Sequence, residues 1–339
     1  MWLQTTWYVL YIAIISGYVI LDGFDLGVGM LSPFIAHTDY DRRILLNSIG
    51  PVWDGNEVWL VLGGGALFAA FPLVYASLFS GFYLAMMLVL LVLIMRTVAI
   101  EFRSKRPESW WRSLWDWTFT LSSFGITILL GVALGNVIRG ISLDQQGNMN
   151  VNLLDLLNPY SITLGLVAVA MLSLHGAIFL TQKAEGALLQ RIKNLIPKLL
   201  IAFFVLMTIL IVWTLLRSEQ FTQNFKDRPW TVIFPVLAFV AIVSAWLFVR
   251  RGAYLSAFLS SATMIALLLG AVACGMYPVM LHSTTNSAYD LTVQNASSAK
   301  ETLTVMFVIA LIGMPFVLLY TAGVYYFFRG KVELDDESY

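Results

Sequence analysis

Nine long apolar stretches constrain the fold of this chain more than any other feature of its sequence. Each approaches or exceeds the ~20 residues that a helix needs to cross the hydrocarbon core of a membrane. The 339 residues are 59% hydrophobic and only 12% charged, whereas soluble domains carry about 25% charged residues. The sequence therefore predicts an all-α integral membrane protein with about nine transmembrane helices. The expected spans cover approximately residues 7–34, 53–73, 76–100, 117–139, 160–182, 198–217, 230–249, 254–277 and 303–328.

The spans fall into two groups by their charge. Most ionisable residues inside apolar stretches precede residue 140, and far fewer follow Pro159. We therefore expect a first four-helix unit in residues 1–140, which carries the buried carboxylates. A second four-helix unit, a ninth helix and a short cytoplasmic tail are expected in residues 141–339. The long polar segment 278–302 is expected to cap the helix ends.

The segments between the spans predict how the helices are arranged. Very short connections follow the second and seventh spans, which favours antiparallel hairpins of 53–73 with 76–100 and of 230–249 with 254–277. Segments after odd-numbered spans hold 14 of the Lys and Arg residues, and segments after even-numbered spans hold 5. Because cytoplasmic loops carry the excess of Lys and Arg, the N-terminus is predicted outside and the C-terminus in the cytoplasm.

Glycines inside the spans predict close helix approach, because small residues let helix backbones come together in membranes. These residues are Gly23, Gly27, Gly29, Gly63, Gly64, Gly65, Gly131 and Gly135.

The stretch from Asn47 to Phe71 begins as a polar segment and continues as an apolar helix. It places Asp54 and Glu57 near the start of the second span, with Trp53 on one side. A charged side chain inside a membrane helix costs at least ~2.5 kcal/mol, so such a residue is a functional candidate by default. The two carboxylates are three residues apart and are expected to share one helix face.

Further charges are predicted at a similar depth, near the cytoplasmic side. Asp22 and Asp25 share one face of the first span, and Arg96 and Glu101 end the third. Buried carboxylates with too few cations hold protons near neutral pH, and a series of them can carry protons. The predicted proton pathway consists of Asp22, Asp25, Asp54, Glu57, Glu101 and Arg96. The alternative is structural, with Arg96 paired to one acid and the other acids hydrogen-bonded to backbone or to a partner subunit.

The sequence offers no residues for cofactor, metal or covalent catalysis within this chain. A transmembrane haem with two axial histidines needs them on facing helices at one depth, and His37, His175 and His282 do not fall there. His175 is either a titrating group or a hydrogen-bonded core residue. The single cysteine, Cys274, excludes an internal disulfide. Phosphate loops and nucleophile triads are absent, and a net charge of zero does not favour nucleic acid.

Several segments together resemble subunit II of the cytochrome bd quinol oxidases, and the match runs nearly end to end. The most specific is W-D-G-N-E-V-W at 53–59, within R-R-I-L-L-N-S-I-G-P-V-W-D-G-N-E-V-W-L at 42–60. The others are D-G-F-D-L-G-V-G-M at 22–30, G-G-A-L-F-A-A-F-P at 64–72, F-S-G-F-Y-L-A-M at 79–86, R-S-K at 103–105, W-R-S-L-W-D-W at 111–117, L-L-N-P at 156–159 and L-L-Y-T at 318–321.

The resemblance implies a haem-free subunit in a heterodimer of the bacterial inner membrane. A related subunit I would hold two haem b and one haem d, and small single-helix subunits, lipid and quinone are further expected partners. The complex would oxidise quinol and reduce oxygen to water with cytoplasmic protons. For this chain the resemblance implies proton delivery through Asp22, Asp25, Asp54 and Glu101 with Arg96 as counter-charge. It also implies a wall of the oxygen route at Trp59.

Two other functions fit the same buried acids. A proton-coupled secondary transporter also has glycine-rich helices with carboxylates, but it is expected to have broken helices in both halves of the chain. A purely structural membrane scaffold is the second alternative.

Overall fold

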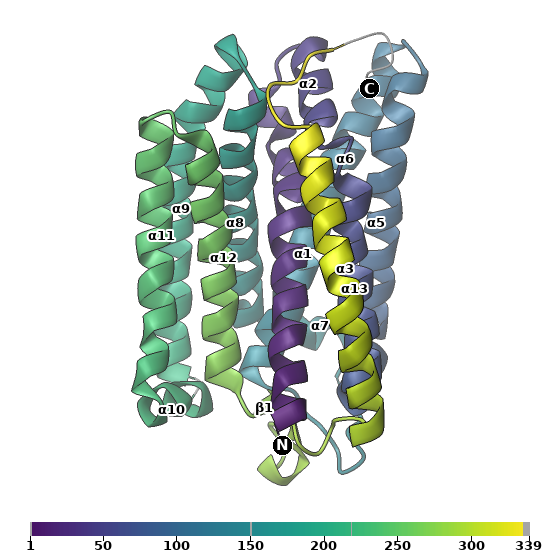
Figure 1. The fold of residues 1–339 in the computed structure, drawn as a ribbon, viewed down its shortest axis with the longest axis vertical. Coiled ribbons are helices and arrows are strands. Elements are labelled where there is room, and N and C mark those ends of the chain that lie inside the picture. The colour runs from purple at the N-terminus through teal and green to yellow at the C-terminus, as the bar shows by residue number, and fades with distance from the viewer. Residues whose placement is uncertain (1, 150, 218, 335–339) are drawn as a thin grey trace.

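The computed structural model describes residues 2–149, 151–217 and 219–334, which form a bundle of long helices (Figure 1). The α-helices are α1 (Trp2–Ile35), α2 (Asp39–Ile49), α3 (Trp53–Ala70), α4 (Pro72–Gly81), α5 (Tyr83–Phe102), α6 (Ser109–Arg139), α7 (Leu153–Leu156), α8 (Pro159–Lys183), α9 (Gly186–Arg217), α10 (Glu219–Asp227), α11 (Ile233–Arg250), α12 (Tyr254–Met276) and α13 (Lys300–Phe327). Short 3₁₀ turns are η1 (Arg103–Lys105), η2 (Pro229–Val232) and η3 (Ser287–Tyr289), and the strands are β1 (Val279–Leu281) and β2 (Leu291–Thr292). We call the end at which α1 begins the lower end and the end that holds α2 the upper end, as drawn in Figure 1.

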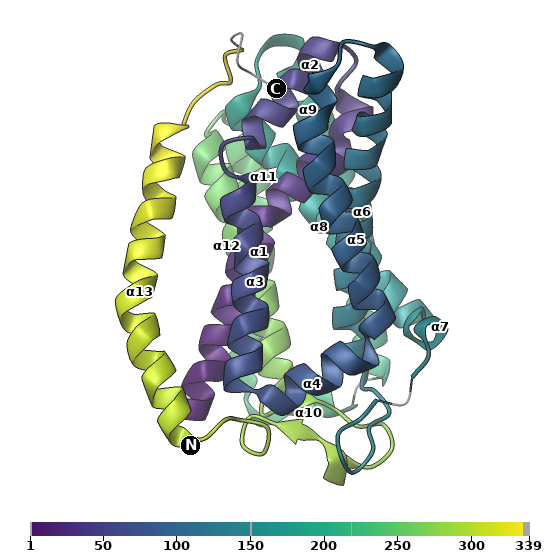
Figure 2. The ribbon, with the colours of Figure 1, turned by 90° about the vertical axis from the view of Figure 1, so that its right-hand side faces the viewer.

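Eight helices in the described part of the chain are long and apolar enough to cross a membrane. They are α1, α5 with η1, α6, α8, α9, α11 with η2, α12 and α13. The shorter α3, with 18 residues, also runs along the bundle (Figure 2) and carries Asp54 and Glu57. The all-α membrane fold is confirmed, and the count of nine spans stays a prediction.

The chain breaks twice around the start of the expected helix at 76–100, and the first break, at Phe71, arises because Pro72 disfavours helical geometry in the residue before it. Phe71 ends α3 with φ −135° and ψ 65°, and Pro72 begins α4, where its missing N–H costs little. A second break at Phe82 lets α5 start at Tyr83. In Figure 2, α4 lies between the lower ends of α3 and α5, so the predicted hairpin of 53–73 with 76–100 is wrong.

The second predicted hairpin is confirmed. α11 packs along α12, and the chain turns between them at Gly252, whose φ of 74° is the left-handed conformation that glycine adopts readily.

α8 lies inside the bundle, where it packs against α1, α6, α9 and α12. A Cβ atom on Gly27 of α1 would lie 2.9 Å from the Cα of Gly176 on α8. A Cβ atom on Gly131 of α6 would lie 2.6 Å from the Cα of Gly165 on the same helix α8. The predicted close approach is therefore confirmed at Gly27 and Gly131. Gly64 differs, because a Cβ atom there would have no neighbour within 4 Å in this chain.

One apolar core continues through both halves of the chain. The expected boundary near residue 140 coincides with the end of α6 at Arg139. α8 nevertheless packs on helices from both halves, namely α1 and α6 on one side of the boundary and α9 and α12 on the other. Buried side chains of α1 and α12 therefore belong to one apolar cluster. Residues 335–339 of the expected tail lie outside the described residues.

α13 stands apart from the rest of the bundle over most of its length (Figure 2). Among its described residues, Leu303 is the buried one, and the Trp7 Nε1–H donates to its carbonyl at 2.9 Å. Beyond the other end of α13, Lys331 Nζ donates to the carbonyls of Thr181 and Ala184 at 3.0 and 2.6 Å, where α8 ends. The helix is thus anchored near both ends and exposes apolar side chains between them.

The segment 278–302 covers the lower end of the bundle, as predicted. Its strands β1 and β2 pair antiparallel, with Val279 opposite Thr292. The backbone N–H of Ser298 donates to the Ala70 carbonyl at the end of α3 at 2.9 Å. A second apolar core joins this segment to α1, α3 and α4.

Candidate functional site

Asp22 and Asp25 of α1 project from one helix face into the interior, as their spacing requires. Both side chains are 0% exposed, and so is Arg96 of α5. Arg96 binds Asp22 through two bonds, Nη2 to Oδ1 at 2.6 Å and Nη1 to Oδ2 at 3.0 Å. Two-bonded pairs of this kind are strong and fix the orientation of both groups. Arg96 therefore neutralises Asp22 and leaves Asp25 without a cation of its own.

α3 adds an amide and a third acid to this site. Glu57 Oε2 lies 3.9 Å from Arg96 Nη1, and Asp25 Oδ2 lies 4.0 Å from Arg96 Nη2. Asn56, which is buried, donates from Nδ2 to Asp25 Oδ2 at 2.8 Å. The hydroxyl of Tyr325 on α13 donates to Asn56 Oδ1 at 2.8 Å. We call the following residues the carboxylate cluster: Asp22, Asp25, Asn56, Glu57 and Arg96.

Four buried polar atoms in or beside the carboxylate cluster have no hydrogen-bond partner within the described part of the chain. They are Tyr18 Oη, Asp25 Oδ1, Glu57 Oε2 and Arg96 Nε. Native proteins satisfy such atoms with water or with groups of a partner, because leaving them bare is costly. Their gathering around one guanidinium indicates a site that is completed by water or by a second subunit.

Two predicted pathway residues lie outside the carboxylate cluster. Asp54, in the first turn of α3, is exposed and lies nearer the upper end than Glu57. Glu57 has a side chain that is 21% exposed, so the cluster reaches the molecular surface on α3. Glu101 is half-buried and lies five residues beyond Arg96 on α5, about 7.5 Å farther along the helix axis.

Trp59, predicted as a wall of an oxygen route, is buried between α3 and α1. A Cβ atom on Gly17 would lie 2.6 Å from its ring, so the indole lies directly on the α1 backbone. The glycine makes room for this contact, and Trp59 faces α1.

An ionic network joins α2, η1 and α6 at the upper end. Arg103 donates from Nε to Asp116 at 2.6 Å and from Nη2 to Asp39 at 2.8 Å. Arg42 also binds Asp116, at 3.1 Å, and Arg112 binds Asp39 at 3.0 Å. These charges hold the upper helix ends in place and are separate from the carboxylate cluster.

Asp41 fastens the turn between α1 and α2 to α9. Its Oδ2 accepts hydrogen bonds from the backbone N–H groups of His37 and Thr38, both at 3.0 Å, and from Arg191 Nη2 at 2.7 Å. Burial by itself would raise the pKa of Asp41, but these hydrogen bonds and the Arg191 charge outweigh it and lower the pKa below its ordinary value. The ionised form therefore stabilises the fold at neutral pH.

We expect the variant Asp41→Asn to melt at a lower temperature than the unaltered protein at about pH 7. Because a lowered pKa contributes stability above the unfolded pKa of about 3.9, the difference should shrink as the pH falls through the lowered value. The measurement is thermal unfolding of the solubilised complex across this pH range. Glu108→Gln, which removes an exposed carboxylate at the same end, is the control and should melt normally. A constant deficit at all pH values would contradict the prediction.

Each of the three histidines contacts a different partner. His175, 0% exposed, lies within hydrogen-bond distance of Ser261 Oγ through Nδ1 at 2.7 Å and of the Ile20 carbonyl through Nε2 at 3.0 Å. His37 lies 3.0 Å from Arg191 and His282 lies 3.0 Å from Asp290. Of the two alternatives for His175, the structure supports the hydrogen-bonded core residue. Within the described ranges, no group of three His, Cys, Asp or Glu side chains could hold a metal ion.

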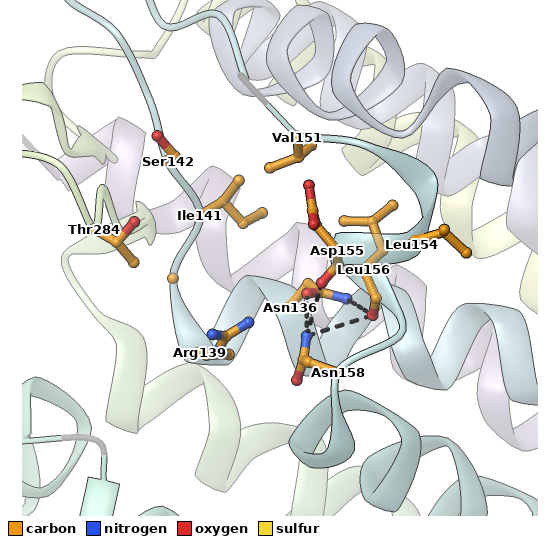
Figure 3. A pocket seen from close by; sticks show the side chains of 11 residues that line it. Asn136, Arg139, Ile141, Ser142, Val151, Leu154, Asp155, Leu156, Asn158 and Thr284 are labelled. Atoms are coloured by element: carbon orange, nitrogen blue, oxygen red, sulfur yellow. Dashed lines mark hydrogen bonds between the residues drawn. The ribbon is translucent and has the colours of Figure 1, made fainter.

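A pocket of about 490 Å³ at the lower end lies between the end of α6, α7 and Thr284 of the segment 278–302 (Figure 3). Arg139 and Asp155 line it. Asn158 donates to Asn136 Oδ1 at 2.8 Å, and Asn136 donates to the Leu156 carbonyl at 2.8 Å, so these amides are satisfied within the chain. The carboxylate cluster does not line this pocket.

The structure adds two residues that the sequence did not single out, Asn56 and Tyr325. Asn56 lies next to Glu57 in the W-D-G-N-E-V-W segment, and a polar amide beside acids at the start of an apolar span is a signal that the sequence contains. Tyr325 is 269 residues away from Asn56 in the chain. Only the packing of α13 brings it to the site.

Comparison with known proteins agrees with this architecture. The family described as cytochrome bd terminal oxidase subunit II matches residues 3–328. The chain belongs to this family. Cytochrome bd ubiquinol oxidase subunit 2 of Bacillus subtilis (strain 168) is 36% identical over 330 residues, with 97% of each chain covered. Cytochrome bd-I ubiquinol oxidase subunit 2 of Escherichia coli (strain K12) is 34% identical over 364 residues, covering 98% of this chain and 96% of that one.

The fold of this subunit II is also that of a solved relative. A chain of the bd oxidase from Geobacillus thermodenitrificans superimposes with a TM-score of 0.80, covering 97% of this chain and 99% of that chain. The two sequences are 18% identical, so this likeness supports the fold alone. The resemblance inferred from W-D-G-N-E-V-W and its companion segments is confirmed by the family match.

Proposed function

We propose that this subunit II assembles with a haem-bearing subunit I in the bacterial inner membrane and delivers cytoplasmic protons to the site of oxygen reduction. The curated relatives are named as subunits of ubiquinol oxidases. In the proposed complex quinol supplies the electrons, oxygen is reduced to water, and the partner ligates two haem b and one haem d. The upper end faces the cytoplasm, in keeping with the excess of Lys and Arg there. Within this subunit, residues 1–140 would form the unit that carries the acids, and residues 141–339 would form the second unit with the last helix.

The excess of acid in the carboxylate cluster carries the proposal. Three carboxylates surround one guanidinium, and Arg96 is already committed to Asp22 by two short bonds. The Arg96 guanidinium lies 4.0 Å from Asp25 Oδ2 and 3.9 Å from Glu57 Oε2, which is too far for a hydrogen bond to either acid. Excess negative charge in a low-dielectric interior is relieved by binding protons. Two such acids on facing helices can pass a proton between them.

The proposed route joins the upper surface to the cluster. Asp54 and Glu101 lie nearer the upper end than the cluster and would receive protons there, with Glu57 and Asp25 farther in. Water at the four unsatisfied polar atoms would connect the steps. Glu57 reaches the surface on α3, where a proton could leave toward subunit I.

The surface proposed for subunit I lies on the first four spans. α3 and α5 both expose apolar side chains, among them Val61, Phe68, Leu88 and Leu91. Asp54 lies on the same exposed face of α3. A carboxylate facing lipid would be costly, whereas a partner subunit can supply polar groups. Trp59 would help to form the apolar oxygen route between α3 and α1.

The test is the variant Asp25→Asn in the complete complex. Asparagine keeps the shape and much of the hydrogen bonding but cannot release a proton, so oxygen uptake per haem d should fall by about 10- to 100-fold. The measurement is oxygen consumption with excess quinol, normalised to the haem spectrum.

Asp54→Asn is expected to lower uptake less, because Glu101 offers a second place of proton entry in the proposed route. Both variants should keep the haem content of the complex. Full turnover in both would remove these acids from the pathway and favour the scaffold alternative, and loss of haem would assign them a structural role.

A further inference from the structure

A chain of two hydrogen bonds runs from α13 to the buried acids. Tyr325 of α13 donates to Asn56 of α3, and Asn56 donates to Asp25 of α1, each at 2.8 Å. Three helices that are distant in sequence thus meet through one amide. The middle of α13 is separated from the rest of the bundle, so the contact of Tyr325 near the end of this helix is one of its few polar contacts with the other helices.

The chemistry of the amide sets the direction of the chain. An ionised carboxylate only accepts hydrogen bonds, so Asn56 must turn its NH₂ group toward Asp25. The amide oxygen then faces Tyr325 and needs a donor, which the phenol supplies. If Asp25 takes up a proton, the amide can turn over, because a carboxylic acid can donate and a phenol can also accept. Both protonation states of Asp25 can therefore be satisfied without moving a helix.

The other groups that face Asp25 do not provide such a contact. Asp22 is bound to Arg96, the Arg96 guanidinium lies 4.0 Å from Asp25, and Glu57 is a like charge. Tyr18 of α1 has no hydrogen-bond partner within the described residues, and neither does the second oxygen of Asp25. Asn56 is thus the group that holds Asp25 in a defined orientation by a short bond.

We propose that Asn56 and Tyr325 are positioning residues that orient Asp25 and set the balance between its protonated and ionised forms. The inference rests on the proposed role of Asp25 in proton transfer and extends it to α13. The hydrogen bond from Tyr325 polarises the Asn56 amide. The polarised amide then donates a stronger hydrogen bond to the Asp25 carboxylate, since hydrogen bonds in a chain strengthen one another. Any displacement of α13 would alter the proton affinity of Asp25.

The test compares three variants of the complete complex with the unaltered protein. Tyr325→Phe removes the hydroxyl and keeps the ring, and Asn56→Leu removes the amide. Tyr326→Phe is the matched control, because Tyr326 is 66% exposed and its ring contact with Arg329 survives the change. The readouts are the pH profile of oxygen uptake and the infrared signal of protonated carboxylic acid, each with haem content measured in parallel.

Tyr325→Phe should displace both the infrared titration and the pH profile to higher pH by about one unit, because the ionised form of Asp25 loses support. Asn56→Leu should displace them farther, and Tyr326→Phe should leave them unchanged. A purely structural role would lower the yield of complex without moving either profile. The infrared signal should disappear in Asp25→Asn, which assigns it.

The outcomes separate this inference from the proposed function. Unchanged profiles in Tyr325→Phe and Asn56→Leu, together with slow turnover in Asp25→Asn, would overturn the positioning role and leave the pathway standing. Unaltered turnover in Asp25→Asn would remove the pathway itself. An infrared titration that still moves in Tyr325→Phe would then support the positioning role alone.

Discussion

Replacing Arg96 with leucine is expected to prevent the accumulation of folded subunit II. Arg96 is 0% exposed and is the cation within 4.0 Å of Asp22, Asp25 and Glu57. Removing one partner of a buried ion pair costs about 3–5 kcal/mol, because a charge is left without compensation. That is a large fraction of the stability of a typical domain. The measurement is the amount of subunit II in the membrane, by immunoblot, and the melting temperature of any complex recovered.

Two variants serve as controls for Arg96→Leu. Arg112→Leu breaks an ion pair whose members are 33% and 43% exposed, so it should change stability by less than about 1 kcal/mol. Asp22→Asn combined with Arg96→Leu removes the directly paired acid as well, and this double variant should accumulate better than Arg96→Leu alone. Normal accumulation of Arg96→Leu would show that the cluster is neutral without its cation.

Adding one methyl group at Gly27 is expected to disrupt the contact between α1 and α8. The new Cβ atom would meet the Leu172 carbonyl oxygen and the Gly176 Cα, which are backbone atoms that cannot turn aside. Overpacking of this kind costs about 1–3 kcal/mol and more where the backbone must move. Gly27→Ala should therefore lower the melting temperature of the complex and reduce its yield.

Gly313→Ala makes the same chemical change on α13, where a Cβ atom has no neighbour within 4 Å in this chain. Because alanine favours a helix over glycine by up to about 1 kcal/mol, this variant should be as stable as the unaltered protein or slightly more stable. Equal melting temperatures of Gly27→Ala and Gly313→Ala would contradict the close crossing of α1 and α8.

Hydropathy and charge along the chain are sufficient to predict the class of the fold and the candidate site residues. A membrane interior admits helices whose backbone bonds are satisfied internally, so long apolar stretches suffice to predict an all-α bundle. The cost of burying charge identifies Asp22, Asp25, Glu57 and Arg96 without any knowledge of their partners. The glycine at position 27 likewise predicts a close crossing, although not the helix that lies across it.

Which of these groups meet depends on how the helices pack in three dimensions. Spacing along a helix relates Asp22 to Asp25, but pairing between helices depends on packing that leaves no local pattern. The expected hairpin of 53–73 with 76–100 did not form, because the chain breaks at Phe71 and α4 lies between α3 and α5. Asp54 lies on the exposed face of α3. For the same reason Tyr325 could not be connected with Asn56 from the sequence, because a contact across 269 residues is made by the fold alone.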